Sequence, residues 1–359
     1  MIKYPVYKPF LSGNEKKYVN DCLDSSWISS KGKYIDLFEN SFKDFLNLNH
    51  ATSVSNGTVA LHLALLALNI KEGDEVIVST LTYIASVNAI KYVNATPIFV
   101  DCNSMNWNID ADKIVQKISS KTKAIMAVHL YGASCEMDKL LSICKKHNLL
   151  LIEDVAEGFG TKFKDKYAGS FGDVSTFSFF GNKTITTGEG GMVVTKEKEL
   201  IQKVAYLKSQ AVSESREYWH NHIGYNFRMT NICAAIGHAQ IENASEILNK
   251  KEQIALFYKK ELENIDVEFQ VEQKETNHSY WMVSILFENE YKKQIIRNRL
   301  SKSGIETRPV FFPIHTMPMY YSKEKFKISD NVSKRGINLP SYPELTQLDI
   351  KYICDQIKK

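Results

Sequence analysis

Residues 149–157 have the sequence Leu-Leu-Leu-Ile-Glu-Asp-Val-Ala-Glu, in which a short apolar run ends in acidic side chains. Similar apolar runs occur at 76–78, 97–100 and 124–128, and amphipathic stretches such as 138–147 separate the later ones. Short strands without polar positions are typical of parallel sheets whose two faces are both covered by helices. The pattern therefore predicts an α/β protein whose large domain, at 20–240, has a mostly parallel mixed sheet.

The sequence changes character on either side of that domain. A Lys/Glu-rich helix is predicted at about 241–265, and alternating segments such as 280–286 follow it. We therefore expect a smaller α+β C-terminal domain at 241–359, with the N-terminal segment 1–19 packing near it. A ligand cleft between the two domains would be ordinary.

Composition excludes several classes of protein. With 359 residues, 44% hydrophobic and 24% charged, the chain is neither disordered, fibrous nor membrane-spanning. The net charge of 45 − 41 = +4 is too small to indicate nucleic-acid binding. No apolar signal segment begins the chain, and its six cysteines lie far apart, so we expect a cytoplasmic protein with reduced thiols.

Three features of the large domain carry chemistry. Ser55-Asn56-Gly57-Thr58 precedes an apolar helix, whose N-terminus favours a phosphate, although a plain helix cap has the same pattern. Asp154 follows a strand, where it would either hold a protonated ring nitrogen or cap a helix. Lys183 lies between an aromatic strand and a glycine-rich turn; it is either a desolvated amine able to form a Schiff base or a solvated loop lysine.

Two other classes of function fit less well. Gly188-Glu189-Gly190-Gly191 lacks the spacing of a dinucleotide-binding loop and no helix is predicted after it, which argues against a nucleotide-dependent oxidoreductase. A non-catalytic regulator on the same scaffold would lack the lysine or carry a DNA-binding appendage, for which the chain has no spare segment.

Together with these features, several segments resemble the DegT/DnrJ/EryC1/StrS family of pyridoxal-phosphate-dependent nucleotide-sugar aminotransferases. The resemblance runs in order over practically the whole chain. The segments that carry it are 54–58, 73–78, 128–132, 153–154, 183–191, 218–220, 224–230 and 308–315. It implies the type I aspartate-aminotransferase fold, pyridoxal 5'-phosphate as cofactor, and the branch that acts on 4-keto-6-deoxy sugars.

The resemblance also implies roles for single residues. Lys183 matches the lysine that forms a Schiff base with the cofactor, Asp154 the carboxylate on its ring nitrogen, and Tyr83 the aromatic that stacks on its ring. Asn226 matches a residue that reaches the phosphate in the neighbouring subunit, which implies a homodimer with shared active sites. The other implied cofactor contacts are Gly57, Thr58 and Ser178 at the phosphate, and Glu157 near the phenolic oxygen, where the wider family commonly has glutamine.

Substrate contacts are expected from four further residues. Arg228 and Arg308 are candidates for the diphosphate, because a guanidinium matches phosphate oxygens, or else they form surface ion pairs. Trp27 would line the sugar cleft or pack between subunits, and His315 lies in a loop that the resemblance places by the substrate. His62 and His129 are expected to be structural. The nine histidines show no metal-ligand spacing, so no metal is expected.

The implied reaction is transamination at C4 of a nucleotide-linked 4-keto-6-deoxyhexose, with glutamate as amino donor, for O-antigen and lipopolysaccharide sugars. Ser26–Gly32 and Arg308–Tyr320 favour dTDP-4-dehydro-6-deoxyglucose as substrate, giving dTDP-viosamine. The alternative is GDP-4-dehydro-6-deoxymannose, giving GDP-perosamine, since the core motifs are common to both.

Overall fold

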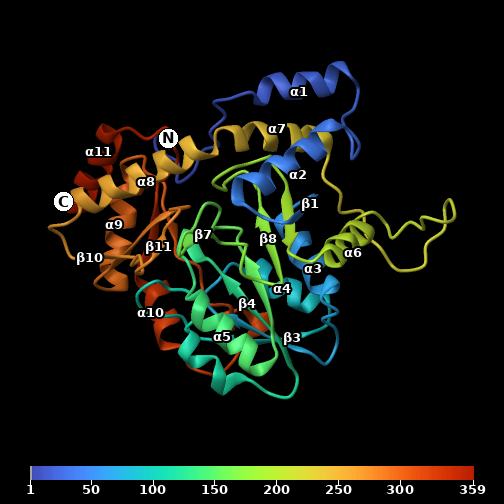
Figure 1. The fold of residues 1–359 in the computed structure, drawn as a ribbon. Coiled ribbons are helices and arrows are strands. Elements are labelled where there is room, and N and C mark those ends of the chain that lie inside the picture. Colours follow the sequence, from blue (N-terminus) through green and yellow to red (C-terminus); the bar gives the residue numbers. More distant parts are fainter. Residues whose placement is uncertain (1) are drawn as a thin grey trace.

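The computed structural model describes residues 2–359, and its elements are labelled in Figure 1. Within these residues, seven strands form one large sheet in the order β1-β9-β8-β5-β4-β2-β3. They are β1 (His50–Val54), β2 (Glu75–Ser79), β3 (Thr96–Val100), β4 (Thr122–Val128), β5 (Leu150–Asp154), β8 (Val174–Ser178) and β9 (Gly191–Thr195). Only β9 runs against its neighbours, which confirms the predicted α/β class with a mostly parallel sheet.

Helices cover both faces of this sheet, because successive side chains of a strand point to opposite sides. Val76 and Val78 pack with residues of α3 (Gly57–Ala67) and α4 (Ile84–Tyr92), whereas Ile77 packs with α5 (Met137–His147) on the other face. α6 (Lys198–Lys208) lies on the α3 face, and α2 (Lys33–Leu46) on the α5 face. Outside α2 lie α7 (Asn231–Glu242) and α1 (Glu15–Asp24) (Figure 1).

The C-terminal part has its own antiparallel sheet, in the order β10-β12-β14-β13. Its strands are β10 (Val267–Phe269), β12 (Val283–Phe287), β13 (Arg308–Pro309) and β14 (Gly336–Leu339). Its helices are α8 (Ala244–Glu261), α9 (Glu290–Lys302), α10 (Lys327–Arg335) and α11 (Gln347–Lys358). A small sheet of β6 (Lys162–Phe163), β7 (Lys166–Tyr167) and β11 (Thr276–Asn277) joins the two parts.

We propose the domain boundary at 240/241, close to the break between α7 and α8. The packing partners change there: α7 lies against α1 and α2, whereas α8 lies against α11. Residues 2–19 of the N-terminal segment also contact the C-terminal part, since the N–H groups of Lys3 and Tyr4 donate to the Gly304 carbonyl. No helix within residues 2–359 is both long and apolar enough to cross a membrane.

Candidate active site

The predicted chemical groups gather at one edge of the large sheet. β1, β2, β4, β5 and β8 all point their carboxyl ends to that edge. Asp154 ends β5, Ser178 ends β8, and Gly57 begins the helix that follows β1. Ligands of parallel sheets bind outside the carboxyl ends of the strands, so the topology itself predicts a site at this edge.

Asp154 is buried, and its two oxygens already have protein partners. Oδ2 accepts a hydrogen bond of 2.7 Å from the Ser86 hydroxyl of α4, and Oδ1 accepts one of 3.1 Å from the Ala156 N–H. These contacts fix the carboxylate at the strand end. A carboxylate held in this way suits a protonated ring nitrogen, because it needs no reorganisation when the charge arrives.

The partly buried Lys183 and the buried Glu157 form a pair of opposite charge. Nζ of Lys183 lies 3.9 Å from Oε1 of Glu157, and the Tyr131 N–H donates to Oε2 at 2.8 Å. Burial lowers the pKa of Lys183, although Glu157 and Asp154 oppose the shift. Burial raises the pKa of Glu157, against the opposing effect of Lys183. The two shifts bring the proton affinities of the amine and the carboxyl closer together, which suits a group that must both take and give a proton.

A candidate phosphate-binding site lies at the N-terminus of α3. Asn56 caps the helix by accepting from the Val59 N–H at 3.0 Å. Among residues 2–359, the N–H groups of Gly57 and Thr58 have no hydrogen-bond acceptor. A Cβ on Gly57 would come within 2.6 Å of the Ser178 Cβ, so only glycine lets the Ser178 side chain lie here. Free N–H groups, a hydroxyl and the helix dipole make an anion site.

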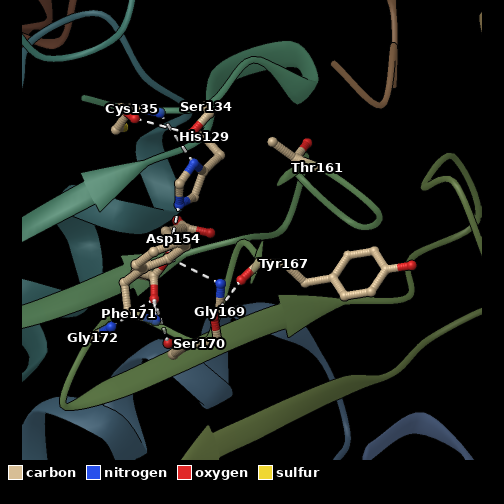
Figure 2. A network of polar contacts seen from close by, with 12 residues as sticks. His129, Ser134, Cys135, Asp154, Thr161, Tyr167, Gly169, Ser170, Phe171 and Gly172 are labelled. Atoms are coloured by element: carbon tan, nitrogen blue, oxygen red, sulfur yellow. Dashed lines mark hydrogen bonds and ion pairs between the residues drawn. The ribbon is translucent and has the colours of Figure 1, made fainter. Parts of the chain in front are cut away.

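Glu153, next to Asp154 on β5, faces the opposite side of the sheet and has a structural role. Its carboxylate accepts from the N–H groups of Gly169, Phe171 and Gly172 at 2.7–2.9 Å and from His129 Nε2 at 3.0 Å (Figure 2). Burial alone would raise the pKa of Glu153, but these donors outweigh it and the pKa is lowered. The ionised carboxylate thus fixes the 169–172 loop beneath the site, and His129 is structural.

The remaining predicted residues lie around this centre. Tyr83 precedes α4 and is 55% exposed, with its ring 5.5 Å from that of Phe311. Asn226 accepts from Arg228 Nη2 at 3.2 Å, and the two lie beside the end of β1. Arg228 Nε is buried and has no hydrogen-bond partner in the described part of the chain, which leaves it free for an oxygen ligand.

Within residues 2–359, three predicted substrate residues form no hydrogen bond or ion pair with Lys183. Trp27 is 56% exposed between α1 and α2, and Arg308 pairs with Glu306 at 3.7 Å. His315 is buried, with Nδ1 2.8 Å from the Thr80 hydroxyl and Nε2 3.5 Å from Asp330. Their substrate roles stay predictions, and His315 has protein partners on both ring nitrogens.

The sequence alone did not indicate Ser86, Tyr131 or Trp281. The Trp281 ring centroid lies 3.9 Å from Lys183 Nζ, although the two residues belong to different parts of the fold. A positive φ of 57° at Tyr131 marks strained backbone beside Glu157. Tyr131 lies within 128–132, one of the segments that carry the family resemblance, but no role was assigned to it from the sequence.

The comparisons with known proteins settle the family. The model of the DegT/DnrJ/EryC1/StrS aminotransferase family matches residues 9–358. This chain belongs to that family. The protein is therefore a pyridoxal-phosphate-dependent aminotransferase, as the resemblance implied.

Individual relatives of this DegT-family protein are close over the whole length. It is 58% identical to the GDP-perosamine synthase of Escherichia coli O157:H7, across 100% of this chain and 99% of the relative. It is 50% identical to that of Vibrio cholerae, across 99% and 98%. Among solved structures, the Helicobacter pylori aminotransferase PseC superposes with a TM-score of 0.94 at 28% identity, covering 99% of this chain and 98% of that one.

These relatives overturn one prediction. The preference for dTDP-4-dehydro-6-deoxyglucose is wrong, because the proteins at 58% and 50% identity are GDP-perosamine synthases. That preference depended on 26–32 and 308–320, where Trp27 and Arg308 are exposed and His315 bonds to Thr80 and Asp330. None of these contacts distinguishes thymine from guanine.

The site residues fit the cofactor that the family uses. The phosphate-binding site at Gly57, Thr58 and Ser178 would hold its phosphate. Asp154 would contact its ring nitrogen, and Lys183 would bond to its aldehyde carbon. The fit follows from the chemical groups present. Free N–H groups suit an anion, a fixed carboxylate suits a cationic ring, and a largely buried amine suits a carbonyl carbon. In residues 2–359, no cluster of His, Cys, Asp and Glu side chains suits a metal ion.

Proposed function

We propose that the protein transfers an amino group from glutamate to C4 of GDP-4-dehydro-6-deoxymannose, giving GDP-perosamine. The observation that supports transamination is the Lys183 amine beside Glu157, with only 13% of the lysine side chain exposed, at the edge of the sheet where Asp154 ends its strand. The nucleotide is supported by the two GDP-perosamine synthases, which this chain resembles over its full length.

Pyridoxal phosphate supplies an aldehyde that condenses with amines and a protonated ring that withdraws electrons. Within this proposal, Asp154 keeps the ring nitrogen protonated, and Ser86 keeps Asp154 in place. The free, neutral amine of Lys183 would remove the proton from the donor's α-carbon and deliver it to the cofactor carbon that had carried the aldehyde. Burial favours that neutral amine, because it lowers the pKa of Lys183.

We further propose a homodimer in which Asn226 of one protomer reaches the cofactor phosphate of its partner. Asn226 lies at the base of the loop 209–227, where it pairs with Ser209, and this loop projects from the body of the protomer after α6 (Figure 1). The unpaired Nε of Arg228, which directly follows this stretch, would serve the phosphate groups of cofactor or substrate. The six free cysteines support the proposed cytoplasmic location, where the product would enter O-antigen synthesis.

The test is an incubation of the purified protein with glutamate and each of the two 4-keto nucleotide sugars. We expect the amino sugar, detected by mass, from the GDP sugar and at least about tenfold less from the dTDP sugar. Equal turnover of both would contradict the proposed nucleotide, and no product from either would contradict C4 transamination. Lys183→Ala serves as the inactive control, and aspartate in place of glutamate tests the donor.

A further inference from the structure

Trp281 belongs to the C-terminal part of the chain, yet its indole forms one side of the Lys183 environment. The residue lies shortly before β12 and is 4% exposed. Nζ of Lys183 is 3.9 Å from the centroid of the indole ring. An ammonium at this distance is attracted by the negative face of the ring, and more strongly where water is excluded.

The indole is held on two sides. Its Nε1–H donates to the carbonyl oxygen of Asn182 at 2.6 Å, and Asn182 directly precedes Lys183 in the chain. The ring of Tyr131 stacks on it, with centroids 5.9 Å apart and planes 13° from parallel. The position of Trp281 is therefore fixed relative to the backbone that carries Lys183.

Tyr131 links this indole to Glu157, the other contact of the amine. The Tyr131 N–H orients the Glu157 carboxyl, which lies 3.9 Å from Lys183 Nζ through its other oxygen. One residue thus supports both groups that contact the amine. A base that takes a proton and returns it elsewhere works best from one defined place, since small displacements cost rate.

We propose that Trp281 is a positioning residue for the reacting amine of Lys183. While the amine is free and protonated, the indole face and the Glu157 carboxyl hold it in one place. The proposal depends on the role of Lys183 proposed above and extends that site into the C-terminal part. The indole attracts only the charged amine, as do the carboxylates of Glu157 and Asp154, whereas burial favours the neutral form.

The experiment measures the pH dependence of Lys183 acylation by acetic anhydride. The full-chain protein is first freed of cofactor by incubation with glutamate and gel filtration, and the modified peptide is quantified by mass spectrometry. Trp281→Leu should lower the midpoint by about one pH unit, a tenfold change in proton affinity, and Trp281→Phe, which keeps an aromatic face, by less. In the loaded enzyme, kcat should fall while KM for the sugar changes little.

Tyr352→Leu is the matched control, because Lys3 Nζ lies 5.4 Å from the centroid of the Tyr352 ring on α11 and the substitution deletes a similar pair away from the site. It should leave the Lys183 midpoint unchanged. An unchanged midpoint in folded Trp281→Leu would overturn the proposal. This outcome is distinct from failure of the proposed function, which would show as amino transfer by Lys183→Ala.

A second measurement applies if Trp281→Leu does not fold. In protein labelled with ¹⁵N-tryptophan, the indole resonance of Trp281 should shift with pH at the midpoint found for Lys183 acylation. That transition should be absent in Lys183→Ala, because the neighbouring charge is gone. A transition that persists in Lys183→Ala would overturn the proposal.

Discussion

Glu157 and Lys183 are two buried groups whose proton affinities depend on each other. An ionised Glu157 raises the pKa of Lys183, and burial lowers it. In Glu157→Gln the raising charge is absent, so Lys183 becomes neutral at lower pH. We expect the rising limb of the pH–kcat profile to move to lower pH by about one unit.

The conservative variant Glu157→Asp controls for this change, because it keeps a carboxylate. Its rising limb should stay nearer to that of the wild type. If the rising limb of the pH–kcat profile lies at the same pH in Glu157→Gln and in the wild type, Glu157 does not set the basicity of Lys183.

Asp154 and Ser86 offer a graded test of the ring-nitrogen contact. Asp154→Asn removes the charge that keeps the ring protonated, so kcat should fall by about 10²–10⁴-fold. Ser86→Ala removes only the 2.7 Å hydrogen bond to Oδ2, so a fall of about tenfold is expected. Steady-state kinetics with saturating cofactor measure both. A Ser86→Ala loss as large as that of Asp154→Asn would contradict a merely supporting role for Ser86.

Single residues also show how far the sequence leads. Asp154 and Lys183 could be singled out, because each lies in a local pattern: an acid at a strand end and a lysine between a strand and a glycine-rich turn. Trp281 could not be singled out, because its hydrogen-bond partner Asn182 lies 99 positions away in the sequence. The two residues meet only when the C-terminal part packs on the large sheet. Ser86 lies in an ordinary apolar helix, and nothing in its neighbours marks it.

At the scale of elements, helix α8 contains a lysine whose charged form is disfavoured by its burial. Lys251 is 2% exposed, and among residues 2–359 its Nζ donates only to the Ser341 carbonyl, at 2.7 Å; burial lowers its pKa to about 7. The unfolded chain binds more protons than the folded one between this value and the ordinary pKa. Lys251 therefore destabilises the fold most at low pH, and the cost disappears as pH rises through that window.

Lys251→Met should consequently stabilise the protein, by about 2 kcal/mol near pH 6 and by less near pH 9.5. Urea unfolding at the two pH values measures the difference. Lys250→Met, at an exposed neighbouring position, should change stability by less than about 0.5 kcal/mol at either pH. A gain that does not depend on pH would show that lost charge is not the cause.

Elements of the large sheet were the most predictable part of the fold. Strands without polar positions and amphipathic helices between them follow directly from burial on two faces, which leaves a clear periodic pattern. The C-terminal sheet was predictable only as a class. Its strands β10 and β13 are short, and their pairing depends on contacts distant in sequence.

At the scale of the whole molecule, the proposed shared site has a direct test. A dimer mixed from Lys183→Ala and Asn226→Ala chains should contain one site in which both residues are native. Activity should therefore reappear on mixing equal amounts of the two variants, to at most about a quarter of the wild-type value per site when dimers form at random, because half of the dimers are mixed and each mixed dimer has one native site of two. Gel filtration checks that mixed dimers form. If they form and stay inactive, Asn226 does not act across the interface.

The nucleotide is the part of the function that sequence motifs failed to predict. The groups that perform transamination are local and chemically distinctive, whereas base selection depends on a surface built from several loops. Trp27, Arg308 and His315 come from two distant segments, and their neighbours in the fold do not mark one base over the other. Full-length similarity to two GDP-perosamine synthases supports the guanosine nucleotide, which the motifs did not favour.

The alternation of side chains along β5 has a consequence for how this chain tolerates change. Glu153 and Asp154 are neighbours in sequence, yet one anchors a loop and the other faces the cofactor edge. The double substitution Glu153→Asp with Asp154→Glu would preserve composition and charge while giving each task a side chain of the wrong length. Deleting one residue upstream in the strand would turn the anchor toward the cofactor edge. The order of these two adjacent acidic residues therefore matters for the fold and the site, although amino-acid composition does not record it.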